Sequence, residues 1–400
     1  MMKFFTRELC IRVALVLVSA LVSFVVLEFF LRLTPLTRLM PYGGTPAYYY
    51  QSDRDLGYGI APNFASTTAS FRADGLQTSS YTLWSNELGC FDTPYQGERP
   101  YKLLLGDSFT WGYVNLQDNW GSVLEKNIGE RVLKCGVAGY GTQQELIKAE
   151  RLLKKLKAPS EILLAYNAND VADDANMPNR FVYKGLLIPN FGGLTDYDAI
   201  QKELPTIFYN SGHYCMWNTP EHPTMQRIKC FLHMNSITYL VVTSRIKDIL
   251  PFALLNKIGL VNTQPSDEVP APVAADKQSN FAHIRTLSDL AQHYGAKFTV
   301  VFMTTADMLL PNTPDPYADV KAYLDQEGIA YIDPRKPIQD LTQKGVSLYW
   351  PSNLHWNVPG NRLAGLLVSE AMLQKVYTQA DTKRLETVKA ALRKEFAFPG

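Results

Sequence analysis

Apolar and polar positions along this chain form a repeating block pattern that predicts a parallel β-sheet. Short runs rich in apolar residues occur at 102–105, 131–134, 161–165, 298–303 and 329–332. Segments with the helical period of apolar residues follow or separate them, at 120–127, 143–157, 281–294, 317–327 and 361–373. Strands that alternate with helices of this length pair in parallel, with helices on both faces. We therefore expect an α/β fold.

The pattern breaks between residues 175 and 280. This stretch contains the segment NTPEHPT and a linker-like segment, QPSDEVPAPVAADKQ, and reads as an insertion. The sequence thus predicts four regions, which follow in chain order. They are a cytoplasmic N-terminus and anchor at 1–40, a juxtamembrane linker and N-terminal extension at 41–98, an α/β domain at 99–378, and a helical tail at 379–400.

The N-terminus carries a candidate membrane anchor. Residues 13–27 are uncharged, and the wider apolar segment 9–33 is interrupted only by Arg12, Glu28 and Arg32. A spanning helix needs about 20 apolar residues, and charged side chains near its ends can extend toward the headgroups. Basic residues before the segment favour a cytoplasmic N-terminus. A cleaved signal peptide is the alternative, but no Ala-x-Ala site follows. We expect an uncleaved single-pass anchor, with the chain after about residue 40 outside the cytoplasm.

Charge and cysteine content narrow the possible partners. Lys plus Arg is 39 and Asp plus Glu is 38, so the net charge of +1 does not favour nucleic acid as a partner. Cys215 and Cys230 could pair in an oxidising compartment, whereas Cys135 ends a predicted strand and is expected to be a small core residue. The histidines and cysteines between 213 and 233 match no zinc-ligand spacing. No metal or cofactor is expected.

Residues 101–112, YKLLLGDSFTWG, are the strongest chemical signal. An apolar run ends at Gly106, and Asp107 and Ser108 follow before a helix. A serine at the carboxyl end of a buried strand has its hydroxyl at the rim of the sheet, where α/β folds present catalytic groups. An ordinary strand-ending turn uses the same residue types. The interpretation therefore depends on partners for Ser108 elsewhere in the chain.

Candidate partners follow later strands. Gly139 follows the second strand, where a glycine lets backbone N–H groups approach a substrate oxygen. Asn169 follows the third strand, and its amide is a neutral donor for an oxyanion. His355 lies in a Trp- and Pro-rich loop just before the last helix of the domain and is a candidate base. Asp170 is expected to cap the next helix, with Asp173 and Asp174 solvated.

Four blocks in this order, GDSFTWG, VAGYG, NAND and LHWNVPGN, resemble the SGNH (GDSL-type) hydrolase superfamily. The chain is most similar to bacterial membrane-anchored members, in which an anchor and a segment like WSNELGCFD precede the Gly-Asp-Ser strand. The resemblance implies a flavodoxin-like three-layer sandwich with a five-stranded parallel sheet. It also implies that Ser108 is the nucleophile, that His355 is the base, and that Ser108, Gly139 and Asn169 form the oxyanion hole.

The chain departs from the family at the residue that orients the histidine. The family usually carries an aspartate two or three residues before it, and this chain has Ser352 and Asn353 there. An asparagine can orient an imidazole but offers no negative charge. Three interpretations stay open: a Ser–His pair oriented by Asn353 or by backbone, a carboxylate from elsewhere such as Asp333, or an impaired site that only binds.

The function expected from the resemblance and the anchor is that of a serine esterase. It would be anchored in the bacterial inner membrane, with its catalytic domain in the periplasm. It would hydrolyse an acyl ester, on a cell-envelope or exported polysaccharide, through an acyl-Ser108 intermediate. One alternative is an O-acyltransferase that modifies polysaccharide with the same Ser108 and His355. The other is a carbohydrate-binding or assembly subunit without activity. Independently of these alternatives, the aromatic run at 48–50 is expected either to stack on sugar rings or to lie in a membrane interface.

Overall fold

The computed structural model describes most of the chain apart from the insertion. The described residues are 2–34, 45–74, 77–97, 100–183, 185–189, 196–210, 228–229, 231–232, 236–239, 241–242, 277–310, 313–351, 354–374 and 379–398. The chain divides into two compact units. One comprises Met1–Gly44, Phe71–Thr78 and Thr206–Asp267, and the other comprises Thr45–Ser70, Ser79–Pro205 and Glu268–Gly400.

The N-terminal segment is one continuous helix, α1 (Met2–Arg32). Its part Ile11–Arg32 has a mean hydropathy of 2.6 and is long and apolar enough to cross a membrane. Its leucine, valine and phenylalanine side chains are largely exposed, as those of a lipid-facing helix would be. The predicted apolar anchor helix is therefore present.

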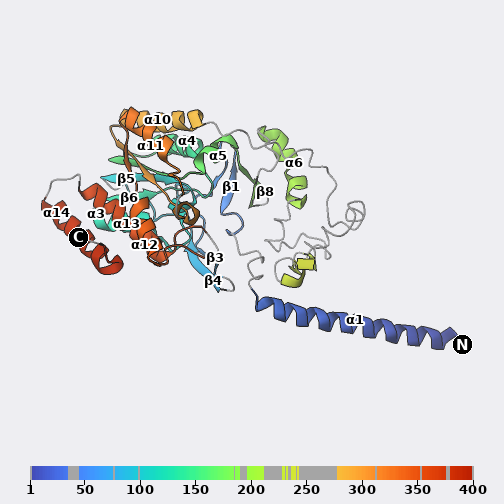
Figure 1. The fold of residues 1–400 in the computed structure, drawn as a ribbon. Coiled ribbons are helices and arrows are strands. Elements are labelled where there is room, and N and C mark those ends of the chain that lie inside the picture. The colour runs from blue at the N-terminus through green and yellow to red at the C-terminus, as the bar shows by residue number, and fades with distance from the viewer. Residues whose placement is uncertain are drawn as a thin grey trace. The chain divides into compact units, whose positions relative to one another are not determined.

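The second unit contains a parallel sheet of five strands (Figure 1). The strands are β5 (Tyr101–Gly106), β6 (Arg131–Lys134), β7 (Glu161–Tyr166), β10 (Lys297–Phe302) and β11 (Ala330–Ile332). Their order across the sheet is β11-β10-β7-β5-β6, and each neighbouring pair is parallel. This is the flavodoxin-like order, in which ligands bind beyond the carboxyl ends of the strands at the switch point, here between β5 and β7. The five predicted strands and the fold class are confirmed.

Helices cover both faces of the sheet. On one face lie α3 (Trp120–Ile128), α12 (Arg335–Gln343) and α13 (Val358–Leu373), with α14 (Gln379–Phe396) packed on α13; on the other lie α4 (Thr142–Leu153), α10 (Lys277–His293) and α11 (Ala318–Glu327). Successive residues of β5 point into the cores on opposite faces of the sheet. Leu104 packs against the core with α3, α12 and α13, and Leu103 and Leu105 pack against the core with α4, α10 and α11. Burial on both faces explains why β5 is a continuous apolar run.

The N-terminal extension is built from small strands. β1 (Tyr50–Asp53) pairs antiparallel with β2 (Gly57–Ile60), and β3 (Thr67–Asp74) forms a two-stranded sheet with β4 (Gln77–Leu83). Tyr49 and Tyr50 are buried. The Tyr49 ring packs on Trp111, so it is not accessible to a sugar ring. Stacking on sugars or lipid headgroups was thus the wrong expectation for these two tyrosines; Tyr48 alone of the three is exposed.

A disulfide joins Cys90 to Cys135, with the two Cα atoms 4.5 Å apart. The prediction that Cys135 is a free core residue is therefore wrong, although the side chain is indeed buried. The segment carrying Cys90 is held against β6, because the backbone N–H of Lys134 donates to Asp92 Oδ2 at 2.8 Å. The predicted pair Cys215 and Cys230 lies outside the described residues.

Candidate active site

Ser108 is the first residue of α2 (Ser108–Trp111), directly beyond the carboxyl end of β5. Asp107 caps this helix: its Oδ1 accepts the N–H of Phe109 at 2.8 Å. Gly106 has φ +148°, and a Cβ there would lie 2.2 Å from Thr110 Oγ1, so the turn requires glycine. The turn therefore presents the Ser108 hydroxyl at the sheet edge.

His355 meets Ser108 from the far end of the domain. Its Nε2 lies 2.6 Å from Ser108 Oγ, across a sequence separation of 247 residues. The ring packs between Phe109 and Tyr113, with centroid distances of 4.7 and 4.5 Å. A neutral imidazole accepts the hydroxyl proton at Nε2 in this geometry, which is the contact that a nucleophile and its base require. The structure thus brings the predicted pair together.

The loop that carries His355 is fixed by hydrogen bonds on either side of it. Asn357 caps α13, since its Oδ1 accepts the Gly360 N–H at 2.9 Å, and its Nδ2 donates to the Ser347 carbonyl at 3.0 Å. The His355 carbonyl accepts the N–H of Trp350 at 3.0 Å. Pro359 occupies the first turn of α13, where a missing N–H costs nothing. These contacts hold the imidazole at a defined position before any substrate arrives.

Burial shifts the pKa values of the two titratable groups next to Ser108 in opposite directions. Burial between the aromatic rings lowers the pKa of His355 to about 4, so the ring is neutral at pH 7. Burial also raises the pKa of Asp107 to about 6. The Ser108 hydroxyl is 3.5 Å from Asp107 Oδ2, a far longer contact than that to His355. His355 is therefore the base that the geometry offers.

Asn169 lies in the same cavity as the Ser–His pair. The cavity has a volume of about 310 Å³ and is lined by Ser108, His355 and Asn169 together with Met308 and Leu354. Asn169 stands at the start of α5 (Asp170–Ala175), at the carboxyl end of β7. An exposed amide in such a position can donate a hydrogen bond to a ligand oxygen. The structure thus brings Asn169 into the cavity of the Ser108–His355 pair, and its oxyanion role stays a prediction.

Gly139 is not among the residues that line this cavity, although it occupies a left-handed turn with φ +79°. The guanidinium of Arg180 lies over it: a Cβ on Gly139 would be 1.2 Å from Arg180 Nη1. Arg180 itself donates to the Ala138 carbonyl at 3.3 Å. The left-handed backbone conformation therefore favours glycine here, and the Arg180 guanidinium occupies the space above it.

A carboxylate connects the two predicted oxyanion donors. Asp173 accepts the Asn169 Nδ2 at 2.6 Å and the Asn179 Nδ2 at 2.9 Å, and Asn179 Nδ2 also donates to the Gly139 carbonyl at 2.6 Å. Asp173 is thus partly buried in a network rather than solvated, and burial raises its pKa. Its position orients the Asn169 amide and leaves that group's other N–H for a ligand.

The predictions for Asp170 and Asp174, two acidic side chains near the site, are wrong. Asp170 does not cap α5; its buried carboxylate accepts the Asn167 N–H at 3.1 Å. Asp174 is not solvated, since it lies 3.0 Å from His283 Nδ1. Glu145 is buried nearby, and neither of its oxygens has a hydrogen-bond partner among the described residues. Burial raises the pKa of Glu145 and of Asp170 well above the usual range.

The sequence left open which group orients the His355 ring. Ser352 and Asn353 lie outside the described residues. Asp333, the other carboxylate considered, bonds to the Lys321 ammonium and accepts the Arg335 N–H at 2.9 Å. Its charge is therefore already matched by a lysine.

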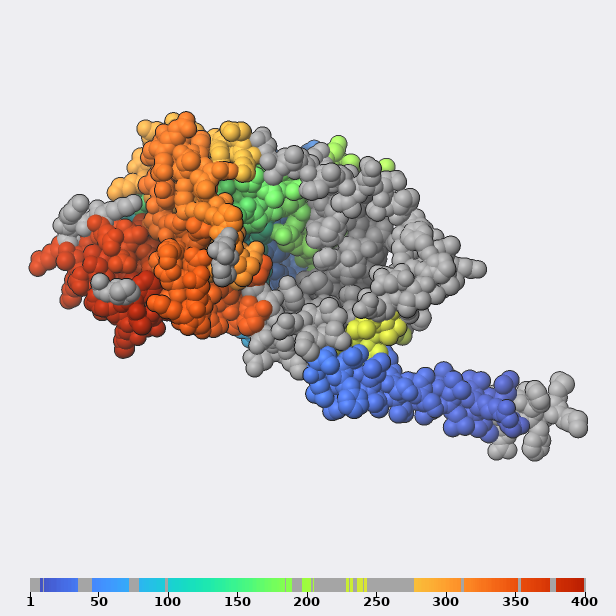
Figure 2. Space-filling view, in the orientation of Figure 1, coloured from blue at the N-terminus to red at the C-terminus, as the bar shows by residue number. Residues whose placement is uncertain are grey.

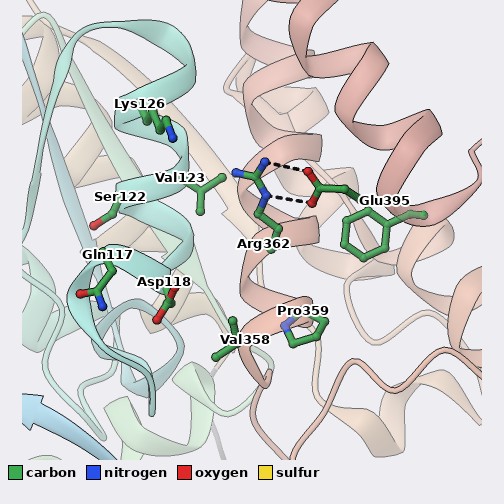
Figure 3. A pocket seen from close by; sticks show the side chains of 10 residues that line it. Gln117, Asp118, Ser122, Val123, Lys126, Val358, Pro359, Arg362 and Glu395 are labelled. Carbon is green, nitrogen blue, oxygen red and sulfur yellow. Dashed lines mark hydrogen bonds and ion pairs between the residues drawn. The ribbon is translucent and has the colours of Figure 1, made fainter.

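A larger cavity lies elsewhere on the second unit, between α3, α13 and α14 (Figure 3). It has a volume of about 640 Å³, and Arg362 and Glu395 form a double hydrogen bond at its wall. Its lining includes Ser122, Lys126 and the carboxylates Asp118 and Glu395 but no histidine. The Ser108–His355 pair belongs to the smaller cavity. The described part of the chain also holds no group of three or more side chains able to bind a metal, and the cluster at 213–233 lies outside it.

Solved structures with a similar fold are known, whereas no protein-family model and no curated protein matches the chain. Several of the solved structures that resemble it are described as G-D-S-L family proteins or GDSL-like lipases. A lipolytic G-D-S-L family protein from Veillonella parvula is 13% identical, with a TM-score of 0.38, covering 69% of this chain and 99% of its own.

Two more solved structures show the same level of likeness. A GDSL-like lipase from Bacteroides thetaiotaomicron is 11% identical (TM-score 0.33), covering 69% of this chain and 89% of its own. The esterase EstA from a Pseudoalteromonas species, in a structure inhibited by monoethylphosphonate, is 10% identical (TM-score 0.35), covering 69% of this chain and 97% of its own. These values describe fold alone, so the roles of site residues rest on the distances given above.

Proposed function

We propose that the protein is a membrane-anchored serine esterase that forms an acyl intermediate on Ser108. The observation that carries the proposal is the 2.6 Å contact between Ser108 Oγ and His355 Nε2. It supports an active enzyme over a subunit that only binds, since a binding site has no need of a neutral base on a serine hydroxyl. The alternative of an O-acyltransferase uses the same pair and differs only in the acceptor.

The geometry supports a two-step reaction. Ser108 Oγ attacks the ester carbonyl carbon while His355 Nε2 takes the hydroxyl proton, and the Asn169 amide and the Ser108 N–H donate to the oxyanion. The Gly139 N–H is proposed as a further donor on the family resemblance alone, since Gly139 does not line the cavity. The C–O bond of the ester then breaks, and His355 returns the proton to the leaving alcohol. Water repeats the sequence on the acyl-Ser108 ester and releases a carboxylic acid. Asn353 is the proposed orienting group for His355.

Two features support a site outside the cytoplasm. The disulfide between Cys90 and Cys135 is of the kind that persists in oxidising compartments. The apolar helix α1 precedes the hydrolase unit and can anchor it. We therefore place the site on the periplasmic side of a bacterial inner membrane.

The size of the cavity at Ser108 indicates the size of the acyl group that it can hold. Its volume of about 310 Å³ is at the small end for ligand pockets and suits a short acyl group such as acetyl. We propose as substrate an acyl ester on a cell-envelope or exported polysaccharide, because such polymers lie within reach of an anchored periplasmic domain.

The test is turnover and covalent labelling of the purified full-length protein in detergent. We expect hydrolysis of p-nitrophenyl acetate and stoichiometric mass addition by a serine-directed phosphonate. Chromatography with a sugar acceptor present then separates the two enzymes: free acetate indicates the esterase, and O-acetyl sugar indicates the transferase. Absence of both turnover and labelling would replace the proposal with the binding subunit.

The pH dependence gives a second test. Because the pKa of His355 is lowered to about 4, the base stays neutral as the pH falls from 7 to 5. We expect kcat/KM to decline only as the pH passes through about 4, rather than near the 6.5 of a free histidine.

Asp107→Asn is the matched control, since asparagine caps helices as well as aspartate. Asp107 has a pKa of about 6. An acid limb near pH 6 that disappears in Asp107→Asn would assign the limb to Asp107 and contradict His355 as the titrating group.

A further inference from the structure

The apolar helix α1 contains a glutamate, Glu28, near its C-terminal end. Glu28 belongs to the span Ile11–Arg32, where an unpaired carboxylate is expensive. Arg32 Nε donates to its Oε1 at 2.9 Å, an i,i+4 pair near the end of the helix. Only 14% of the Glu28 side chain is exposed, which one arginine does not explain.

The remaining contacts come from the insertion, more than 200 residues further along the chain but within the same compact unit. Ser236 Oγ and the Thr238 N–H donate to Glu28 Oε2 at 2.8 and 2.9 Å, and the Ile237 N–H donates to Oε1 at 3.2 Å. The carboxylate thus satisfies the N–H groups that begin the helical turn 237–239. Figure 2 shows this part of the insertion, in yellow, against the C-terminal end of α1.

This attachment fixes the depth of the insertion segment. Glu28 lies four residues before Arg32, so the contact is about 6 Å inside the end of the span at 1.5 Å per residue. Backbone N–H groups at that depth need protein acceptors, and Glu28 supplies them.

Apolar side chains of the same segment face outward. Ile228 is 50% exposed, Phe231 65% and Val242 42%, whereas Ile237 at the attachment is buried. Exposed aliphatic and aromatic side chains beside the end of a membrane span have the character of an interfacial element. We propose that the described residues of this segment (228–229, 231–232, 236–239 and 241–242) lie in the membrane interface, in contact with lipid, and are held against α1 by Glu28. The inference rests on α1 crossing a membrane and is independent of the esterase activity.

The test uses Phe231→Trp in the full-length protein, in nanodiscs of phosphatidylcholine with or without bromine on the acyl chains. The six native tryptophans give the background, measured on the unsubstituted protein. We expect bromine to reduce the added emission about twofold or more, because bromine quenches on contact. Leu17→Trp, within α1, is the positive control. An added emission that bromine leaves unchanged would overturn the proposal, and a blue-shifted but unquenched emission would show instead that a second copy of the chain covers the face.

The role of Glu28 is tested in the same background. Adding Glu28→Ala to Phe231→Trp should abolish most of the quenching, since the three donors lose their acceptor. Glu8→Ala is the matched control, because Glu8 pairs with Arg12 in the same i,i+4 manner at the other end of the helix. Equal quenching in the Glu28→Ala and Glu8→Ala proteins would overturn the attachment by Glu28.

Discussion

Ser108→Ala should abolish esterase turnover, by about 10⁴-fold or more, because no other atom takes over the covalent step. It should equally abolish labelling by the serine-directed phosphonate. The substitution leaves the helix cap intact, since Asp107 still accepts the Phe109 N–H. The unfolding free energy should therefore change by no more than about 0.5 kcal/mol. The measurements are initial rates, intact-protein mass and thermal unfolding.

The matched control is Ser288→Ala, on α10 and away from the cavity. Its turnover and labelling should equal those of the unsubstituted protein. Labelling that survives in Ser108→Ala would locate the nucleophile elsewhere. Loss of labelling with turnover intact would show that Ser108 reacts with the phosphonate but does not carry the turnover.

Removing the disulfide should cause the largest loss of stability. Cys90 and Cys135 are 45 residues apart, and closing a loop of that length lowers the entropy of the unfolded chain by an amount worth about 4 kcal/mol. The double variant Cys90→Ser/Cys135→Ser should unfold at a correspondingly lower urea concentration. It should keep its specific activity at low temperature, since the cavity that contains Ser108 is lined by neither cysteine.

Reductant supplies the control for this prediction. Dithiothreitol should lower the urea midpoint of the unsubstituted protein toward that of the double variant and leave the variant unchanged. If the two proteins unfold at the same midpoint without reductant, the disulfide does not form or does not constrain the unfolded chain.

The sheet was predictable because the physics of its strands is local. A strand buried on both faces must be apolar throughout, as Leu103, Leu104 and Leu105 are, so its position is visible in the sequence. Helix α12 was missed because it is only nine residues long and buries only Ile338 and Leu341, so its one-sided apolar pattern is too short to be recognised.

The sequence predicted the polar residues that line the cavity but not the residues that hold them in place. Ser108, Asn169 and His355 follow strands or precede a helix, and parallel topology brings such positions to one edge. Tyr113, whose ring packs on His355, and Asp173, which holds Asn169, were not foreseen. Their roles depend on side-chain directions in three dimensions, which spacing along the chain does not encode.

The disulfide was missed for a related reason. Cys135 ends an apolar strand and satisfies every local criterion for a core residue. Its partner lies in a segment without regular structure, whose register against β6 is set by the bond between Asp92 and the Lys134 N–H. Such a tertiary contact has no periodic signature.

The distance of 247 residues between Ser108 and His355 has a consequence for biosynthesis. Ser108 leaves the ribosome early and His355 almost last, and domains fold as their residues emerge. Helix α13, which follows the His355 loop, packs on α3, where Asn361 Oδ1 accepts the Trp120 N–H at 3.2 Å. Shorter nascent chains therefore lack the proposed base for Ser108. On the proposed mechanism, esterase activity becomes available only after the C-terminal part of the unit has been synthesised and has packed.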